Sequence, residues 1–223
     1  FLMLLHGVID SPDIPLNVSR SYLQSDGNVK KINSYITKKV ADKLTELYKD
    51  DRKSYEEKWK DINLFVKYGM ISEEKFYEKV EKIALLQSLD NKMRTFEEYK
   101  KFVSKTQKDK DKNTVILYSN DAEKQDSYIE DAKKRNYDVV LFDNVIDSHY
   151  INHIEQKLDK VQIKRVDADI LDKLIDKDEK KETVIKDEDK ESLKKLFEKI
   201  INNQSTVVNV ESLNPDESPV IIT

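Results

Sequence analysis

The residues best suited to chemistry lie in a proline-containing segment, residues 7–24, which carries the arginine Arg20 in a chain whose cations are mostly lysines. Asn17 and Gln24 lie close to it in sequence and can hydrogen-bond an anion or the loop itself. Arginine presents a rigid fork of N–H donors that matches phosphate oxygens, whereas lysine is a point charge. The segment predicts a polar loop that presents a guanidinium. Two interpretations stay open, a phosphate-sensing arginine and a surface arginine that pins its own loop.

A second candidate is a histidine pair. His149 and His153 are four residues apart on an expected helix, with Asp147 nearby, and this spacing could hold a metal ion. The chain shows no third ligand and lacks the glutamate that a zinc-protease helix places between its histidines. Two ordinary helix histidines are therefore the favoured interpretation, and no metal site is expected.

A nucleotide site of the chain's own is not expected either. The chain has three glycines, Gly7, Gly27 and Gly69. The turn after the first strand of its α/β part, residues 119–121, is Ser-Asn-Asp. Dinucleotide fingerprints and P-loops both need several glycines, so that the backbone can approach the phosphates closely.

Composition limits the remaining function classes. The 223 residues are 38% apolar and 38% charged, with both signs interspersed and a net charge of −4, so binding of nucleic acid through a basic field is not expected. Cysteine is absent, which excludes disulfides and cysteine-based metal sites or nucleophiles. No apolar run approaches the ~20 residues of a membrane span.

The elements that follow the arginine segment are predicted to be three helices. The first begins at Asn28, and its apolar residues recur every three or four positions as far as Leu47. The second covers about residues 53–68 and ends with Gly69 at its C′ position. Short joints between consecutive helices predict an antiparallel coil.

Ser72 is predicted to cap the third helix, whose apolar face runs through Phe76 to Leu86. Aromatic residues fall on the apolar faces of these helices, and we expect them to pack in the core: Tyr55, Trp59 and Tyr77.

The pattern then changes to alternating strands and helices. Residues 95–98 form a capping box that opens a short helix to about Ser104, and the charge run 108–113 predicts a loop. Alternation of this kind predicts βαβ units and a small parallel sheet. The expected elements are strand Thr114–Tyr118, helix Asp121–Asn136, strand Tyr137–Phe142, helix Asp147–Leu158 and strand Val161–Val166.

The last part of the chain begins with a charged stretch, Asp176–Glu191, which is the best candidate for a linker. An amphipathic helix through Leu193 and Ile200 follows, and then two expected strands, Thr206–Glu211 and Pro219–Thr223. About 35 residues cannot bury a stable core alone. The chain also opens on an apolar run that lacks the features of a signal peptide. We therefore expect a piece of a larger protein.

The segment Gly-Val-Ile-Asp-Ser-Pro-Asp-Ile-Pro-Leu-Asn-Val-Ser-Arg, with Leu-Gln after it, closely resembles the middle-domain catalytic loop of the heat-shock protein 90 chaperones. The bacterial HtpG type is the most similar. The likeness continues downstream, where residues 95–99 resemble the family's short helix before its small α/β/α subdomain and residues 114–119 resemble the first strand of that subdomain. Residues 134–141, and then 146–147, resemble its next helix end, strand and turn. Residues 206–223 resemble the opening strands of its C-terminal domain. Ser21 and Tyr22 depart from the pattern, because many members carry glutamate and a larger aliphatic residue there.

This resemblance implies a mixed α+β and α/β fold with the following parts. Residues 1–27 end the large middle subdomain with its catalytic loop, 28–94 form the helical coil, 95–176 form the small α/β/α subdomain, 177–191 form the linker, and 192–223 begin an incomplete α+β dimerisation domain.

The resemblance also implies a function, as part of a cytoplasmic ATP-dependent chaperone. ATP, with Mg²⁺, would be held by an N-terminal domain that this sequence lacks; Arg20 matches the arginine that reaches its γ-phosphate, with Gln24 and Asn17 supporting the loop. The partners of this chaperone would be unfolded client proteins, the N-terminal ATPase domain and a second subunit. The fragment alone would be inactive. The alternative is a non-enzymatic helical and α/β scaffold for protein–protein contacts.

Overall fold

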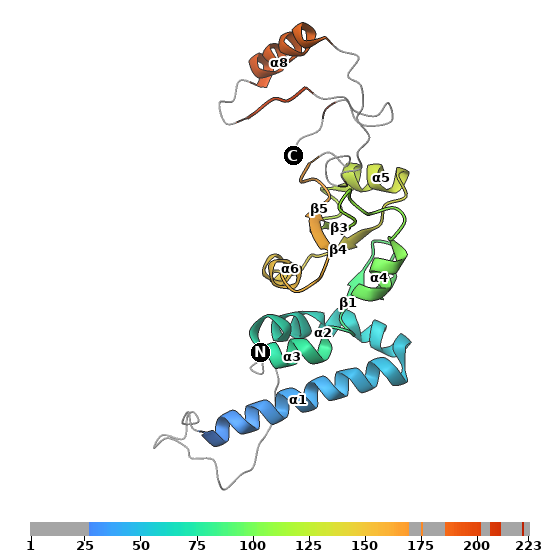
Figure 1. Ribbon diagram of the computed structural model, residues 1–223, viewed down its shortest axis with the longest axis vertical. Helices are drawn as coiled ribbons and strands as arrows, with labels where there is room; N and C mark the ends of the chain where they lie inside the picture. Colours follow the sequence, from blue (N-terminus) through green and yellow to red (C-terminus); the bar gives the residue numbers. More distant parts are fainter. Residues whose placement is uncertain (1–26, 170–174, 176–185, 202–205, 211–219, 221–223) are drawn as a thin grey trace.

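The computed structural model describes residues 27–169, 175, 186–201, 206–210 and 220 (Figure 1). The helices are α1 (Gly27–Asp50), α2 (Arg52–Ser72), α3 (Glu74–Val80), α4 (Phe96–Phe102), α5 (Asp126–Lys134), α6 (Asp147–Glu155) and α8 (Asp187–Ile201). The strands are β1 (Leu85–Gln87), β2 (Met93–Thr95), β3 (Thr114–Ser119), β4 (Val139–Leu141) and β5 (Val161–Arg165). Over these described stretches, no helix has the length and apolar character that crossing a membrane requires.

The first three helices form the predicted coil, with α1, α2 and α3 packed on one another at one end of the molecule (Figure 1). The 24-residue α1 buries its apolar stripe through Ala41 and Leu44. The aromatic residues expected in the core are there, since Tyr55, Trp59 and Tyr77 are each at most 5% exposed.

The boundaries of the second and third helices differ from the prediction. Gly69 lies inside α2, which continues to Ser72, so neither residue has the expected capping role. The helix continues because Met70 is buried with Gly69 against its neighbours, and this packing outweighs the low helix propensity of glycine. Glu73 stands at the N-cap of α3 without a side-chain capping bond.

The third helix is also shorter than predicted, because it ends at Val80 and Leu86 belongs to a strand. Strands β1 and β2 form an antiparallel hairpin in which Leu85 pairs with Thr95. The turn between them uses a positive φ of 63° at Asn91, a conformation that asparagine tolerates. By its periodicity, the short apolar run that ends at Leu86 fits a helix as well as a strand. Only its pairing with a neighbouring strand decides between the two.

Helix α4 begins as the sequence predicts. Thr95 Oγ1 accepts a hydrogen bond from the backbone N–H of Glu98, and the Glu98 carboxylate accepts one from the backbone N–H of Thr95 at 2.7 Å. This reciprocal capping box satisfies two N–H groups that would otherwise lack partners at the helix start.

The predicted parallel sheet is present, with strand order β4-β3-β5. Leu117 of β3 is in register with Val139 of β4, and Thr114 with Val161 of β5. Alternate residues of β3 face opposite layers, because side chains alternate along a strand. Val115 and Leu117 pack in a cluster with residues of α5, whereas Ile116 joins the core that includes residues of α6 and of the coil.

The helix expected after the charged stretch is α8, which begins at Asp187 and so includes the last residues of the predicted linker. Leu196 and Ile200 are exposed on it. The strand predicted from Thr206 is wrong for the described residues 206–210, which have no regular structure. A strand needs a partner to satisfy its backbone N–H and C=O groups, and the described part of the chain pairs no strand with them. The strand predicted for 219–223 lies outside the described residues except at Val220.

Candidate functional site

The predicted site residues Asn17, Arg20 and Gln24 lie outside the residues that the structure describes, and their roles stay predictions. The first described element after them is α1, which begins at Gly27. Its contacts with α2 and α3 bury Ala41 completely. The chain that follows the arginine segment is therefore tied to the packed coil.

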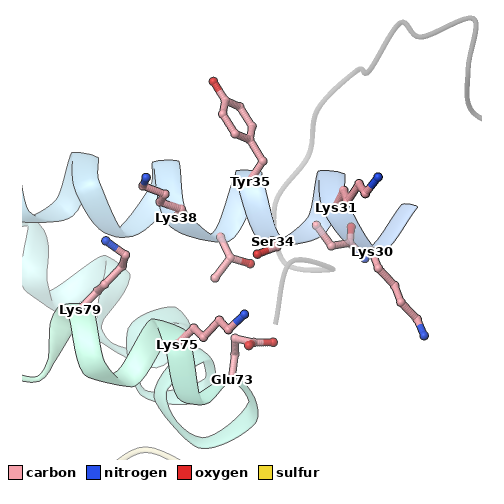
Figure 2. Close-up of a pocket in the computed structure, with 10 residues that line it drawn as sticks. Lys30, Lys31, Ser34, Tyr35, Lys38, Glu73, Lys75 and Lys79 are labelled. Atoms are coloured by element: carbon pink, nitrogen blue, oxygen red, sulfur yellow. The ribbon is translucent and has the colours of Figure 1, made fainter. Parts of the chain in front are cut away.

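A cavity of about 800 Å³ lies between the first half of α1 and helix α3 (Figure 2). Five lysines and one carboxylate line it together with polar residues of α1. The charged residues are Lys30, Lys31, Lys38, Glu73, Lys75 and Lys79. Figure 2 shows Lys75 and Lys79 rising from α3 toward α1, with Ser34 on the facing side of α1. The cavity is basic, although the chain as a whole is acidic.

The carboxyl end of β3 is the place where a parallel sheet commonly binds a phosphate group. Here Gln125, at the start of α5, fills that position. Its Oε1 accepts hydrogen bonds from the Ser119 hydroxyl at 2.8 Å and from the backbone N–H groups of Asn120 at 3.2 Å and Asp121 at 3.4 Å. The hydrogen-bond donors at this edge of the sheet are thus used within the fold.

The two histidines behave as ordinary helix residues. His149 is exposed on α6, whereas the ring of His153 meets Tyr77 of α3 edge-on, with centroids 5.5 Å apart. Burial, followed by the nearby Lys157, lowers the pKa of His153 and favours its neutral form. In the described part of the chain, no three histidine, aspartate or glutamate side chains group in a way that could hold a metal ion.

Asp147, the predicted neighbour of the histidine pair, has a different role. Its Oδ1 lies 2.6 Å from Nζ of Lys67 on α2, and both side chains are buried, at 3% and 5% exposed. Its other oxygen accepts the backbone N–H of Asn144 at 3.0 Å. Burial lowers the pKa of Lys67, and the Asp147 carboxylate opposes that change.

Sequence reasoning missed this ion pair. The partners are 80 residues apart, and a lysine beside the apolar stripe of a helix looks like a solvated residue. The pair joins the coil to the α/β part, and a second polar contact lies beside it, from Nδ2 of Asn144 to Oδ1 of Asn63 at 3.0 Å.

Comparison with known proteins gives a consistent result. The family model described as Hsp90 protein matches residues 1–223. Chaperone protein HtpG of Bacteroides thetaiotaomicron and that of Porphyromonas gingivalis are each 49% identical to the chain over 226 aligned positions, which cover 100% of this chain and 33% of each relative. The chain thus spans about a third of the length of these curated relatives.

Among solved structures, the middle domain of a protein described as a heat shock protein from Plasmodium falciparum matches with a TM-score of 0.51 at 15% identity. The match covers 66% of this chain and 61% of that one. At this identity the likeness concerns the fold alone.

Proposed function

The chain belongs to the Hsp90 protein family, and we propose that it is the middle part of an ATP-dependent chaperone of the HtpG type, followed by the start of the C-terminal domain. The observation that carries the proposal is the likeness to HtpG chaperones along the entire chain. The fold supports it, because it resembles a middle domain of a heat shock protein.

In this proposal Arg20 acts on a nucleotide that another domain holds. ATP, with Mg²⁺, supplies the phosphoryl group that is transferred to water. A planar guanidinium suits the γ-phosphate oxygens, and Arg20 donates to them as charge develops there, while Gln24 and Asn17 hold the loop. In support, one place where a parallel sheet commonly binds phosphate is already filled, because Gln125 accepts the N–H groups of Asn120 and Asp121 at the carboxyl end of β3.

The remaining parts of the proposal follow from the family. The partners are unfolded or partly folded client proteins, the protein's own N-terminal domain and a second subunit joined through the C-terminal region. The compartment is the cytoplasm. The chain contributes client-binding surface in addition to the arginine.

Steady-state ATP turnover by the full-length protein tests the role of Arg20. Arg20→Ala should lower kcat by on the order of 10²–10³, because it removes a cationic donor to the reacting phosphate, and should leave ATP affinity nearly unchanged. Arg20→Lys should rescue poorly, since a point charge does not reproduce the fork. Gln24→Ala should be milder, by about 1 kcal/mol, because it removes one neutral hydrogen bond. Near-normal turnover in Arg20→Ala would instead favour the non-enzymatic scaffold.

A further inference from the structure

The first half of α1 has an unusual charge pattern. Residues 27–41 contain four lysines and no acidic residue, and the first turn of α1 has no acid. Other helix lysines pair with an acidic residue on their own helix, such as Lys43 with Glu46 at 2.6 Å and Lys133 with Glu130 at 2.7 Å. A helix N-terminus already carries a partial positive charge, so lysines there are unfavourable for the helix itself. The helix dipole therefore gives no reason for lysines at this end of α1.

Helix α3 adds to the excess of positive charge from the opposite side of the cavity. Of its two lysines there, Lys79 lies 3.2 Å from Asp42 of α1. For the cavity's other four lysines, the described residues provide no carboxylate within ion-pair distance. The five lysines and Glu73 among the described lining residues sum to a formal charge of +4, and Asp42 beside Lys79 reduces this to +3. Such a wall attracts an anionic ligand of matching shape.

The chemical type of the cations in the cavity indicates which anionic groups its ligand carries. Among the described residues that line the cavity, all five cations are lysines, spaced along two helices, and none is an arginine of the type whose fork matches one phosphate group. Separate point charges suit separate carboxylates along an extended chain. Ser34 and Asn33 add side-chain groups that can bond a peptide backbone. A volume of about 800 Å³ is in the range of sites that enclose a ligand of a few residues.

We propose that this cavity between α1 and α3 binds an acidic peptide segment, rich in aspartate and glutamate, of a partner protein. The lysines of the two helices neutralise its carboxylates from opposite sides. The proposal concerns a surface of the coil and does not depend on Arg20 or on nucleotide.

Fluorescence anisotropy on the full-length protein tests it, with a short labelled peptide of alternating glutamate and glycine as the probe. The variant Lys38→Gln/Lys75→Gln removes one cation from each wall. A matched control, Lys60→Gln/Lys101→Gln, removes two exposed helix lysines elsewhere on the molecule. The cavity variant should weaken peptide binding about tenfold, since each screened ion pair contributes modestly. The control should change it less than about twofold, and added salt should weaken binding by the unchanged protein.

Two results would overturn the proposal. One is equal weakening in the cavity variant and the control, because binding would then follow net charge alone. The other is failure of the peptide to bind or to compete while tripolyphosphate or a single-stranded oligonucleotide binds, because the cavity would then select phosphate polymers. Circular dichroism of both variants confirms that the helices are intact, so that lost binding is not lost folding.

Discussion

The buried ion pair between Lys67 and Asp147 permits a quantitative prediction for folding stability. Nζ and Oδ1 are 2.6 Å apart, and the two side chains are 5% and 3% exposed. The rings of Phe142 and Tyr150 lie 5.1 and 5.6 Å from the lysine Nζ, so little water can replace a lost partner. Lys67→Met keeps much of the aliphatic stem and removes the charge. It leaves the Asp147 carboxylate buried with the Asn144 N–H as its remaining partner among the described contacts.

An uncompensated buried charge of this kind costs about 3–5 kcal/mol. We therefore expect Lys67→Met to lower the free energy of unfolding by about that amount near pH 7. The double variant Lys67→Met/Asp147→Asn should regain much of the loss, because a neutral amide oxygen still accepts the Asn144 N–H. The two single changes should thus be strongly non-additive.

Urea denaturation followed by the fluorescence of Trp59 measures these differences, since this is the chain's single tryptophan and is 3% exposed. Lys79→Met is the matched control, because Lys79 also pairs across two helices but lies at the surface, 3.2 Å from Asp42. It should cost at most about 1 kcal/mol. A loss below about 1 kcal/mol in Lys67→Met, or additive single changes, would show that water or a neighbouring group compensates Asp147.

Two further predictions concern the capping box and alkaline pH. Thr95→Ala removes the hydroxyl that accepts the Glu98 N–H and should lower the free energy of unfolding by about 1 kcal/mol in urea denaturation, whereas an unchanged midpoint would contradict the capping role. Burial raises the pKa of Tyr77 to about 12 and that of Tyr99 well above its ordinary value. Because the unfolded chain then loses protons that the folded chain keeps, stability should fall as the pH rises above about 10, and a flat profile of unfolding free energy against pH would refute this.

The local part of the fold could be predicted from the sequence. The capping box at Thr95 depends on residues three apart, and the sheet depends on short apolar runs separated by helical patterns. Such signals need no knowledge of tertiary structure. The coil was predictable for the same reason, since its apolar residues repeat along each helix.

Boundaries set by tertiary packing could not be predicted in this way. Gly69 stays helical because its neighbours pack around it, and Leu86 becomes a strand because residues of β2 pair with β1. The hairpin then reaches the parallel sheet, where Ser88 bridges to Val140 and its hydroxyl donates to the Asp138 carboxylate at 2.6 Å. None of these partners is close in sequence to the residue it constrains.

The same distinction between local sequence signals and tertiary packing applies to the candidate site residues. Arg20 stays a prediction, made from its residue type, the loop-like sequence around it and a family resemblance, and its proposed role depends on a nucleotide that another domain would hold. Gln125 and Lys67 act through partners that only the fold brings to them. A glutamine in a helical pattern and a lysine beside an apolar stripe carry no signal of such roles.

The contacts between the coil and the α/β part bear on how the arginine segment would be positioned. Four polar or aromatic contacts join α2 and α3 to α6 and the residues on either side of it: Lys67 with Asp147, Asn63 with Asn144, Glu74 with Lys157, and Tyr77 with His153. The same apolar core contains residues of all three helices. Interfaces of this kind resist small continuous displacements, because close-packed side chains transmit strain. Helix α1, the described element that follows the arginine segment in sequence, packs on α2 and α3 and therefore keeps a fixed orientation relative to the coil and the sheet. Domain closure in the proposed chaperone would then move this unit as one body toward the nucleotide.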